Sequence, residues 1–220
     1  AGLSASLARL LAAEGYALTL VARDTGKLGA LAAETAARTV TMDATDPAAT
    51  AALFDGCDAA PRVVVYNPSA RVRGPLTELD PEEVRHALEV TAYAAFLTGQ
   101  AAARAMLAAA PRDGVRGTIL FTGASAGVKG FPGSAPFAMG KFAERGRAQV
   151  MARQLHPRGI HVAWIKIDGA IRNPGRREPP DAPDSMLDPD AIARAYLAVI
   201  RQDRSAWSDE LTLRPWVERF

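Results

Sequence analysis

The chain has 220 residues, which is enough for one domain with a large core and short for two. Its net charge of +2 does not indicate nucleic acid as a partner. No apolar run reaches the length of a membrane span, so no membrane partner is predicted either. Cys57 is the single cysteine, which excludes an internal disulfide and indicates a reducing, cytoplasmic location. The three histidines lack metal-ligand spacing, and no metal site is predicted.

Apolar, β-branched runs alternate along the chain with stretches of helical periodicity. The predicted elements, in chain order, are a helix over 3–14 ended by Gly15, a strand over 16–22, a helix over 27–37, a strand over 39–42, a helix opened by Asp46-Pro47, a strand over 63–66, a long helix from Asp80-Pro81 to Ala109, a strand over 118–121 that breaks at 122–125, a helix over 134–155, a strand over 159–167, a helix over 191–201 and a strand over 210–213. This alternation predicts βαβ crossovers, and therefore a single-domain α/β fold with a doubly wound parallel sheet.

Ligands of such a sheet bind at the carboxyl ends of its strands. Several of the predicted strands end in polar or small residues, namely Arg23-Asp24, Asp43-Ala44, Asn67-Pro68-Ser69, Thr122 to Ser125, and Asp168-Gly169. The segment Gly2-Leu3-Ser4 opens the first helix, where free N–H groups and the helix dipole favour a phosphate. In the helix that follows Ser125, Phe137 and Lys141 are four positions apart and share one face.

Taken together, these residues resemble the short-chain dehydrogenase/reductase family, and the resemblance covers essentially the whole chain. Gly2 and Ser4 match the second and third glycine positions of the family's G-x-x-x-G-x-G turn. The acidic adenine contact of the family matches Asp43, and Asn67 is the one residue kept from its N-A-G turn. The resemblance implies a Rossmann-like, NAD(P)-binding single domain over residues 1–220, with the family's opening strand and first glycine upstream of residue 1.

The Y-x-x-x-K pair of the family aligns with Phe137 and Lys141, and its P-G dipeptide aligns with Asp168-Gly169. Arginine after the second strand of the family suits the 2′-phosphate of NADP, so Arg23 favours NADP over NAD. In the alternative, Arg23 points to solvent and Asp24 binds the ribose. The implied cofactor contacts are Gly2, Leu3, Ser4, Arg23, Asp43, Ala44, Asn67, Pro68, Ser69, Lys141, Gly169 and Ile171.

In the family, a tyrosine exchanges the substrate's proton, a lysine lowers that tyrosine's pKa and holds the nicotinamide ribose, a serine polarises the carbonyl, and an asparagine supports a water relay. Here the tyrosine is Phe137, the serine position falls on Ala124 with Ser125 next to it, and the asparagine position falls on Thr91. Lys141 is the one position kept. The candidate catalytic residues are therefore Lys141, Ser125 and Thr91, with Asp168 as a further polar candidate.

Three functions remain open, because loss of a positioned acid typically slows catalysis about 10²–10⁴-fold. The first is an NADP-dependent oxidoreductase that transfers a hydride to or from an unidentified small molecule at a non-standard site, with a relocated or substrate-supplied acid. The second is a catalytically disabled dinucleotide-binding protein, acting as a sensor or inactive partner subunit. The third is a structural subunit without cofactor, because Ser4 and Ser69 add bulk and Pro68 removes a backbone donor. The resemblance also implies a homodimer or homotetramer, and a substrate lid over residues 172–185.

Overall fold

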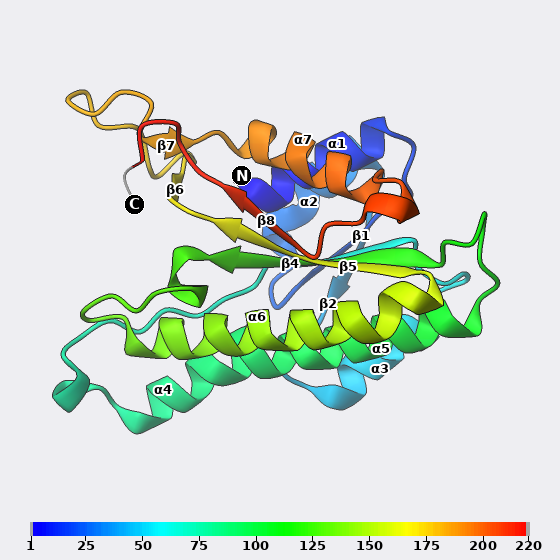
Figure 1. The fold of residues 1–220 in the computed structure, drawn as a ribbon, viewed down its shortest axis with the longest axis horizontal. Helices are drawn as coiled ribbons and strands as arrows, with labels where there is room; N and C mark the ends of the chain where they lie inside the picture. Colours follow the sequence, from blue (N-terminus) through cyan, green and yellow to red (C-terminus); the bar gives the residue numbers. More distant parts are fainter. Residues whose placement is uncertain (1, 219–220) are drawn as a thin grey trace. The chain divides into compact units, whose positions relative to one another are not determined.

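The structure is a computed structural model that describes residues 2–218. The ends of the predicted domain, Ala1 and the last two residues, lie outside the described residues. Helices and strands alternate along the chain, as the sequence predicts (Figure 1). The described residues form two compact units. The first, here called the terminal unit, contains residues 2–43, 168–201 and 213–218, and the second, the central unit, contains residues 44–167 and 202–212.

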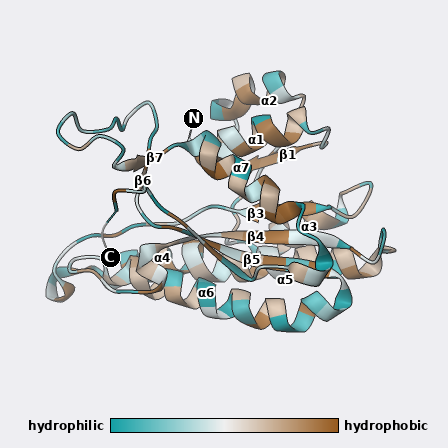
Figure 2. Ribbon diagram, turned by 45° about the horizontal axis from the view of Figure 1, so that its top comes forward, coloured by the Kyte–Doolittle hydropathy of each residue, from teal (hydrophilic) through white to brown (hydrophobic). Residues whose placement is uncertain are grey.

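The terminal unit pairs short parallel strands with three helices. Thr19 to Ala22 lie opposite Arg38 to Thr41 in a parallel ribbon, and α7 packs against α1. Its elements are α1 (Leu3–Ala13), β1 (Thr19–Ala22), α2 (Gly29–Thr35), β2 (Arg38–Thr41), β6 (Ala170–Ile171), β7 (Met186–Leu187) and α7 (Pro189–Ile200). Strands β6 and β7 are also parallel and flank the predicted lid, which is the hydrophilic loop beside them in Figure 2.

The central unit is built on a four-stranded sheet of order β3-β4-β5-β8, in which β3, β4 and β5 run parallel. Helices α5 and α6 lie along one face of this sheet (Figure 1), and α3 packs against α5. Its elements are α3 (Pro47–Asp55), β3 (Val63–Tyr66), α4 (Pro81–Leu88), α5 (Ala94–Ala108), β4 (Gly117–Ala124), α6 (Ala135–Leu155), β5 (Ile160–Ile167) and β8 (Glu210–Leu213).

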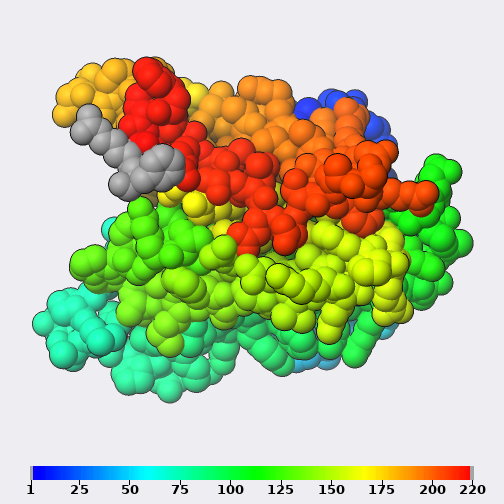
Figure 3. Space-filling view, in the orientation of Figure 1, coloured from blue at the N-terminus to red at the C-terminus, as the bar shows by residue number. Residues whose placement is uncertain are grey.

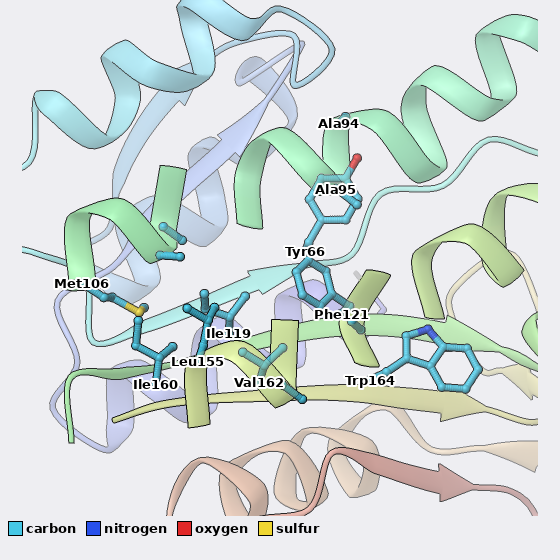
Figure 4. Close-up of a cluster of buried hydrophobic side chains, with 14 residues drawn as sticks. Tyr66, Ala94, Ala95, Met106, Ile119, Phe121, Leu155, Ile160, Val162 and Trp164 are labelled. Atoms are coloured by element: carbon cyan, nitrogen blue, oxygen red, sulfur yellow. The ribbon is translucent and has the colours of Figure 1, made fainter. Parts of the chain in front are cut away.

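The core of the central unit lies between the sheet and these helices. Strand residues Phe121 and Trp164 point into it together with apolar side chains of α5 and α6 (Figure 4). The α5 residues in this layer include Ala94 and Ala95, which are fully buried. Their small side chains allow α5 to lie close to the sheet.

Capping residues define several helix starts as predicted. Asp46, Asp80 and Asp188 each accept a backbone hydrogen bond in the first turn of α3, α4 and α7, and each is followed by proline. Gly15 adopts a φ of 83° just after α1, as expected for a residue that ends a helix.

Three details of the prediction are wrong. The first strand begins at Thr19 rather than Tyr16, because β2 pairs with it only from Thr19 onward. Strand β4 continues through Gly123 to Ala124, where a break was expected, because these residues pair with the end of β5. The long helix predicted from Pro81 contains a π-helical turn, η3 (Glu89–Tyr93), between α4 and α5. Among the described residues, no helix is both long and apolar enough to cross a bilayer.

Candidate active site

The end of β4, the following turn and the start of α6 bring the predicted catalytic positions together. After Ala124, the turn η4 (Ser125–Gly127) is closed by the N–H groups of Val128 and Lys129, which both donate to the carbonyl of Ser125. Helix α6 then contacts η4 and β4. This arrangement places Phe137 and Lys141 on the side of α6 that packs against the strand.

Phe137 lies in an apolar cluster with Ala124 and Ala126. All three side chains are buried, with Phe137 only 8% exposed. These residues include the two positions that the resemblance assigns to a tyrosine and a serine. Here those positions form a hydrocarbon contact, so neither can donate or accept a proton.

Arg71 stacks on this cluster from the loop that follows β3. Its guanidinium carbon lies 4.2 Å from the centroid of the Phe137 ring, within the range of a cation–π contact. The charge of Arg71 also acts on Lys141, whose pKa it helps to lower. Sequence reasoning missed Arg71. Arg71 lies four residues after Asn67, in the loop that follows the same strand, and this position could have indicated that it lies near the site.

Lys141 is turned into the protein interior, where it is 2% exposed. Its Nζ donates to the backbone carbonyl of Thr122 at 2.6 Å, and to Oε1 and Oε2 of Glu144 at 3.2 and 3.1 Å. Burial lowers the pKa of Lys141 and raises the pKa of Glu144, and the attraction within the pair opposes both shifts. The sequence prediction has the lysine facing the cofactor, whereas the ammonium in this structure is engaged by a carboxylate that the prediction did not include.

Glu144 is fully buried and is held from a second side by β5. The indole Nε1–H of Trp164 donates to its Oε2 at 3.1 Å. The indole itself packs against two glycines, because a Cβ added at Gly123 would lie 2.1 Å from it and one at Gly127 would lie 2.5 Å from it. The glycines of the turn therefore make room for Trp164, and Trp164 fixes the carboxylate of Glu144. The i, i+3 spacing of Lys141 and Glu144 is the signal that could have revealed this pair.

A third charged residue, Arg147, continues the row on α6. Its guanidinium carbon lies 3.8 Å from the centroid of the Phe121 ring. Burial lowers the pKa of Arg147 to about 10, and the attraction of Glu144 opposes this shift. Glu144 is therefore the negative charge between two buried positive groups.

Thr91 lies in the π-helical turn and is fully buried. Its hydroxyl oxygen accepts a hydrogen bond from the backbone N–H of Ala70 at 3.1 Å. Gly140 of α6 packs directly on it, since a Cβ at Gly140 would lie 2.8 Å from the Thr91 Cβ. Thr91 thus braces the loop that carries Asn67, Pro68 and Ser69. Its catalytic role stays a prediction.

The other predicted residues of the central unit lie at strand ends. Ser125 is half-buried directly after β4. Asn67 is half-buried after β3, whereas the adjacent Pro68 and Ser69 are exposed. Ala44, half-buried, begins the unit.

In the terminal unit, the predicted phosphate site is the start of α1. Gly2 has a φ of 80°, and a Cβ added to it would have no atom within 4 Å, so the space beside this glycine is open. Ser4 is exposed, whereas the side chain of Leu3 is buried in the core. Any contact of Leu3 with a ligand is therefore restricted to its backbone.

The two residues that could select the cofactor, Arg23 and Asp24, differ in their contacts after β1. Asp24 accepts a hydrogen bond from the N–H of Gly26 at 3.0 Å, and its other oxygen lies 3.4 Å from the Lys27 ammonium. Arg23 is exposed directly after the strand. Asp24 is thus engaged within its own turn. Asp43, the predicted adenine contact, is exposed after β2.

The segment after β5 turns sharply at Gly169, whose φ is 152°. A Cβ at Gly169 would lie 2.8 Å from the side chain of Leu187, so only glycine fits there without displacing a neighbour. Asp168 forms an ion pair with Arg214, with 3.2 Å between the charged atoms. Ile171 is half-buried in β6.

Beside β7, a hollow of about 280 Å³ opens in the terminal unit. Its lining includes Glu178 and Asp184 from the predicted lid, together with Leu187 and Trp216. The lid is anchored at several points: Glu178 accepts a hydrogen bond from the N–H of Met186 at 3.1 Å, and Asp184 accepts one from the indole N–H of Trp216 at 3.3 Å. The hollow is large enough for a small molecule.

Comparison with known proteins gives consistent matches. The profile of the family described as short chain dehydrogenase matches residues 1–174. An L-2,3-butanediol dehydrogenase from Corynebacterium glutamicum is 30% identical over 194 residues, which cover 77% of this chain and 72% of that protein. Among solved structures, a short-chain dehydrogenase from Rhodopseudomonas palustris is 35% identical, with a TM-score of 0.81 over 97% of this chain and 93% of its own. A metagenomic short-chain oxidoreductase in complex with NADP is 26% identical, with a TM-score of 0.82 over 99% of this chain and 94% of its own. The prediction of a Rossmann-like α/β fold with a parallel sheet is confirmed.

The Lys141–Glu144 pair generates a prediction about stability. Lys141→Met leaves the Glu144 carboxylate buried without its counter-ion, which is expected to lower the free energy of unfolding by about 3–5 kcal/mol at neutral pH. The double variant Lys141→Met/Glu144→Leu should recover only part of this loss, because the Trp164 N–H loses its acceptor and the buried Arg147 guanidinium loses the attraction of Glu144. Urea unfolding measures both values.

The deficit of Lys141→Met should also depend on pH. In that variant, burial raises the folded-state pKa of Glu144 above the unfolded-state value, so the cost of burying the carboxylate is fully present above the folded-state pKa, shrinks as the pH falls through it, and is gone below the unfolded-state pKa. The deficit should therefore be smaller at about pH 5 than at about pH 8. Arg85→Met, which breaks an exposed pair with Glu82, is the control and should change stability little. Equal deficits for Lys141→Met and the double variant would contradict the prediction.

Proposed function

Because the chain belongs to the short-chain dehydrogenase family, we propose that it is an NADP-dependent oxidoreductase that acts by hydride transfer on a small molecule at a non-standard site. The observation that carries the choice of NADP is the end of β1. Both side chains are exposed, but Asp24 is engaged by Gly26 and Lys27, whereas the guanidinium of Arg23 suits the 2′-phosphate. The NADP complex of the metagenomic relative is in keeping with this proposal.

In each unit taken by itself, some residues suit one part of a dinucleotide. At the start of α1, the open space beside Gly2 and the N-terminal N–H groups suit the pyrophosphate. Asp43 would accept hydrogen bonds from the adenine, and Lys141 would donate to the nicotinamide ribose. The remaining proposed contacts are Leu3, Ser4, Ala44, Asn67, Pro68, Ser69, Gly169 and Ile171. The nicotinamide, when bound, supplies or accepts the hydride.

The proton requires a source other than Phe137 and Ala124. Of the polar candidates, Thr91 is fully buried, and Lys141 and Asp168 are held in ion pairs. Ser125 is half-buried at the end of β4, which makes it the preferred candidate for polarising a substrate oxygen or nitrogen.

Serine is a weak acid, so we propose substrates that need little proton donation, such as a polarised C=C or C=N bond. The butanediol dehydrogenase relative makes small vicinal diols and hydroxyketones reasonable first probes.

A second function is favoured by the apolar contact of Phe137 with Ala124. The tyrosine and serine positions carry apolar side chains, and Lys141 is paired with Glu144. A protein of this kind binds the dinucleotide but does not catalyse hydride transfer. Such a protein would act as a sensor or as an inactive partner subunit.

We also propose a homodimer or homotetramer, formed through α5 and α6. These elements and the adjoining turn η3 expose large apolar side chains, including the stacked rings of Tyr93 in η3 and Phe96 in α5 and, on α6, Phe142 and Val150. The outer side of α6, yellow-green in Figure 3, is open along its length. A cytoplasmic location is proposed on the basis of the free cysteine, Cys57.

A titration with NADPH and NADH tests the cofactor assignment. The wild-type protein should bind NADPH more tightly than NADH, measured by nicotinamide fluorescence. Arg23→Ala should weaken NADPH binding about 10- to 100-fold, because it removes charge-assisted hydrogen bonds to the phosphate, and should change NADH binding little. Arg194→Ala, which removes an exposed arginine from α7, is the matched control. The absence of binding by either dinucleotide would contradict both functions proposed above.

Phe137→Tyr distinguishes an active enzyme from a disabled one. In a disabled protein that binds NADPH, the restored hydroxyl should raise the rate of reduction of butane-2,3-dione by at least about 10²-fold, because it supplies a positioned acid. The rate of NADPH consumption measures this gain. Phe142→Tyr, which adds a hydroxyl to the exposed part of α6, should give no gain. If the wild type already reduces activated alkenes or imines at a rate that Ser125→Ala abolishes, the oxidoreductase is the correct function.

A further inference from the structure

The Lys141 ammonium is held inside the protein by two groups. The carbonyl of Thr122 accepts from it at 2.6 Å, and the two oxygens of the Glu144 carboxylate lie 3.2 and 3.1 Å from its Nζ. The residue is only 2% exposed. A hydroxyl of a bound ribose therefore competes with Glu144 for the ammonium.

The carboxylate of this pair is the immobile partner. Trp164 donates to Glu144 from β5, and the indole is confined by Gly123 and Gly127. Glu144 is therefore anchored to the sheet as well as to α6. The lysine, by contrast, has a long unbranched stem, so any exchange of partners is made by movement of the ammonium away from Glu144.

The charges around Lys141 indicate how Glu144 affects the attraction of this region for an anionic dinucleotide. Besides Glu144, the charged groups that act on Lys141 are Arg71, in the loop after β3, and Arg147, on α6, and both are positive. Glu144 neutralises the centre of this group. Without its charge, the positive residues would present a stronger attraction to an anionic dinucleotide.

We propose that Glu144 is a positioning residue that competes with the cofactor for the Lys141 ammonium, so that dinucleotide binding exchanges a Lys141–Glu144 hydrogen bond for one to the ribose. This inference rests on the proposed function, in which Lys141 contacts the ribose. The inference also explains why the charge of Lys141 can be balanced by Glu144 in this chain. Phe137 has no hydroxyl whose pKa the lysine would need to lower, so the full charge of Lys141 is not required for that purpose.

The decisive comparison is the Kd of NADPH for the wild type and for Glu144→Gln. Glutamine keeps the size of the side chain and an acceptor for Trp164, and it removes the charge that holds the ammonium. Glu144→Gln should bind NADPH about 5- to 10-fold more tightly, because a hydrogen bond to a charged group becomes available without competition. Isothermal titration calorimetry at constant pH and salt measures this difference.

A double-mutant cycle assigns the gain to Lys141. Lys141→Met should weaken NADPH binding less than about threefold in the wild type and about tenfold in Glu144→Gln, since only in the variant is the ammonium fully available. If Lys141→Met alone does not fold, the comparison of Glu144→Gln with Lys141→Met/Glu144→Gln still measures the contribution of the released lysine. Glu82→Gln removes an equal charge from an exposed position on α4 and should leave the Kd unchanged.

Two outcomes would contradict the inference, and they differ from failure of the proposed function. An unchanged Kd for Glu144→Gln, or an equally tight Kd for Glu144→Gln and its Lys141→Met double variant, would show that Glu144 does not govern the lysine. The absence of NADPH binding by the wild type and all variants would instead overturn the proposed function itself.

Discussion

A charged pair in the interior of the central unit determines how its site is built. Glu144 and Lys141 are almost completely shielded from water, and the attraction between them opposes the loss of charge that burial favours for each. The pair fixes the face that α6 presents to β4, because the ammonium also binds the Thr122 carbonyl at the end of that strand. Trp164 extends the same connection to β5. Two strands and a helix are thereby joined through polar contacts inside an otherwise apolar layer.

The chemistry available at the site follows from this arrangement. The positions that would exchange a proton are occupied by Phe137 and Ala124, which pack against each other as core residues do. Charge is still concentrated nearby, in Lys141, Glu144, Arg147 and Arg71. The site therefore has charged side chains that can bind a ligand, but the side chains at positions 137 and 124 cannot donate a proton. Under the proposed function, this combination would bind the dinucleotide and leave protonation to Ser125 or to the substrate.

Sequence reasoning predicted the order of elements and most helix starts, because caps such as Asp80 and apolar periodicity are local signals. It also placed Asn67 and Ser125 at strand ends of the central unit, and Lys141 on the helix that follows Ser125. It failed where tertiary contacts override local preference. Pairing with β5 keeps Gly123 in the strand despite a composition typical of a turn. The partner of Lys141 was missed because a glutamate on a helix is usually exposed, and nothing in the local pattern shows that Glu144 is buried.

The packing of Trp164 has a consequence for how this sequence can change. Its indole fills the space that a side chain at Gly123 or Gly127 would need, and its N–H satisfies Glu144. Substitutions at these four positions are therefore epistatic. A larger residue at either glycine is tolerated only after Trp164 has become smaller, and a smaller residue at 164 is tolerated only where Glu144 has found another donor or has been lost. The two glycines of the turn, Trp164 and the buried pair therefore constrain one another's substitutions.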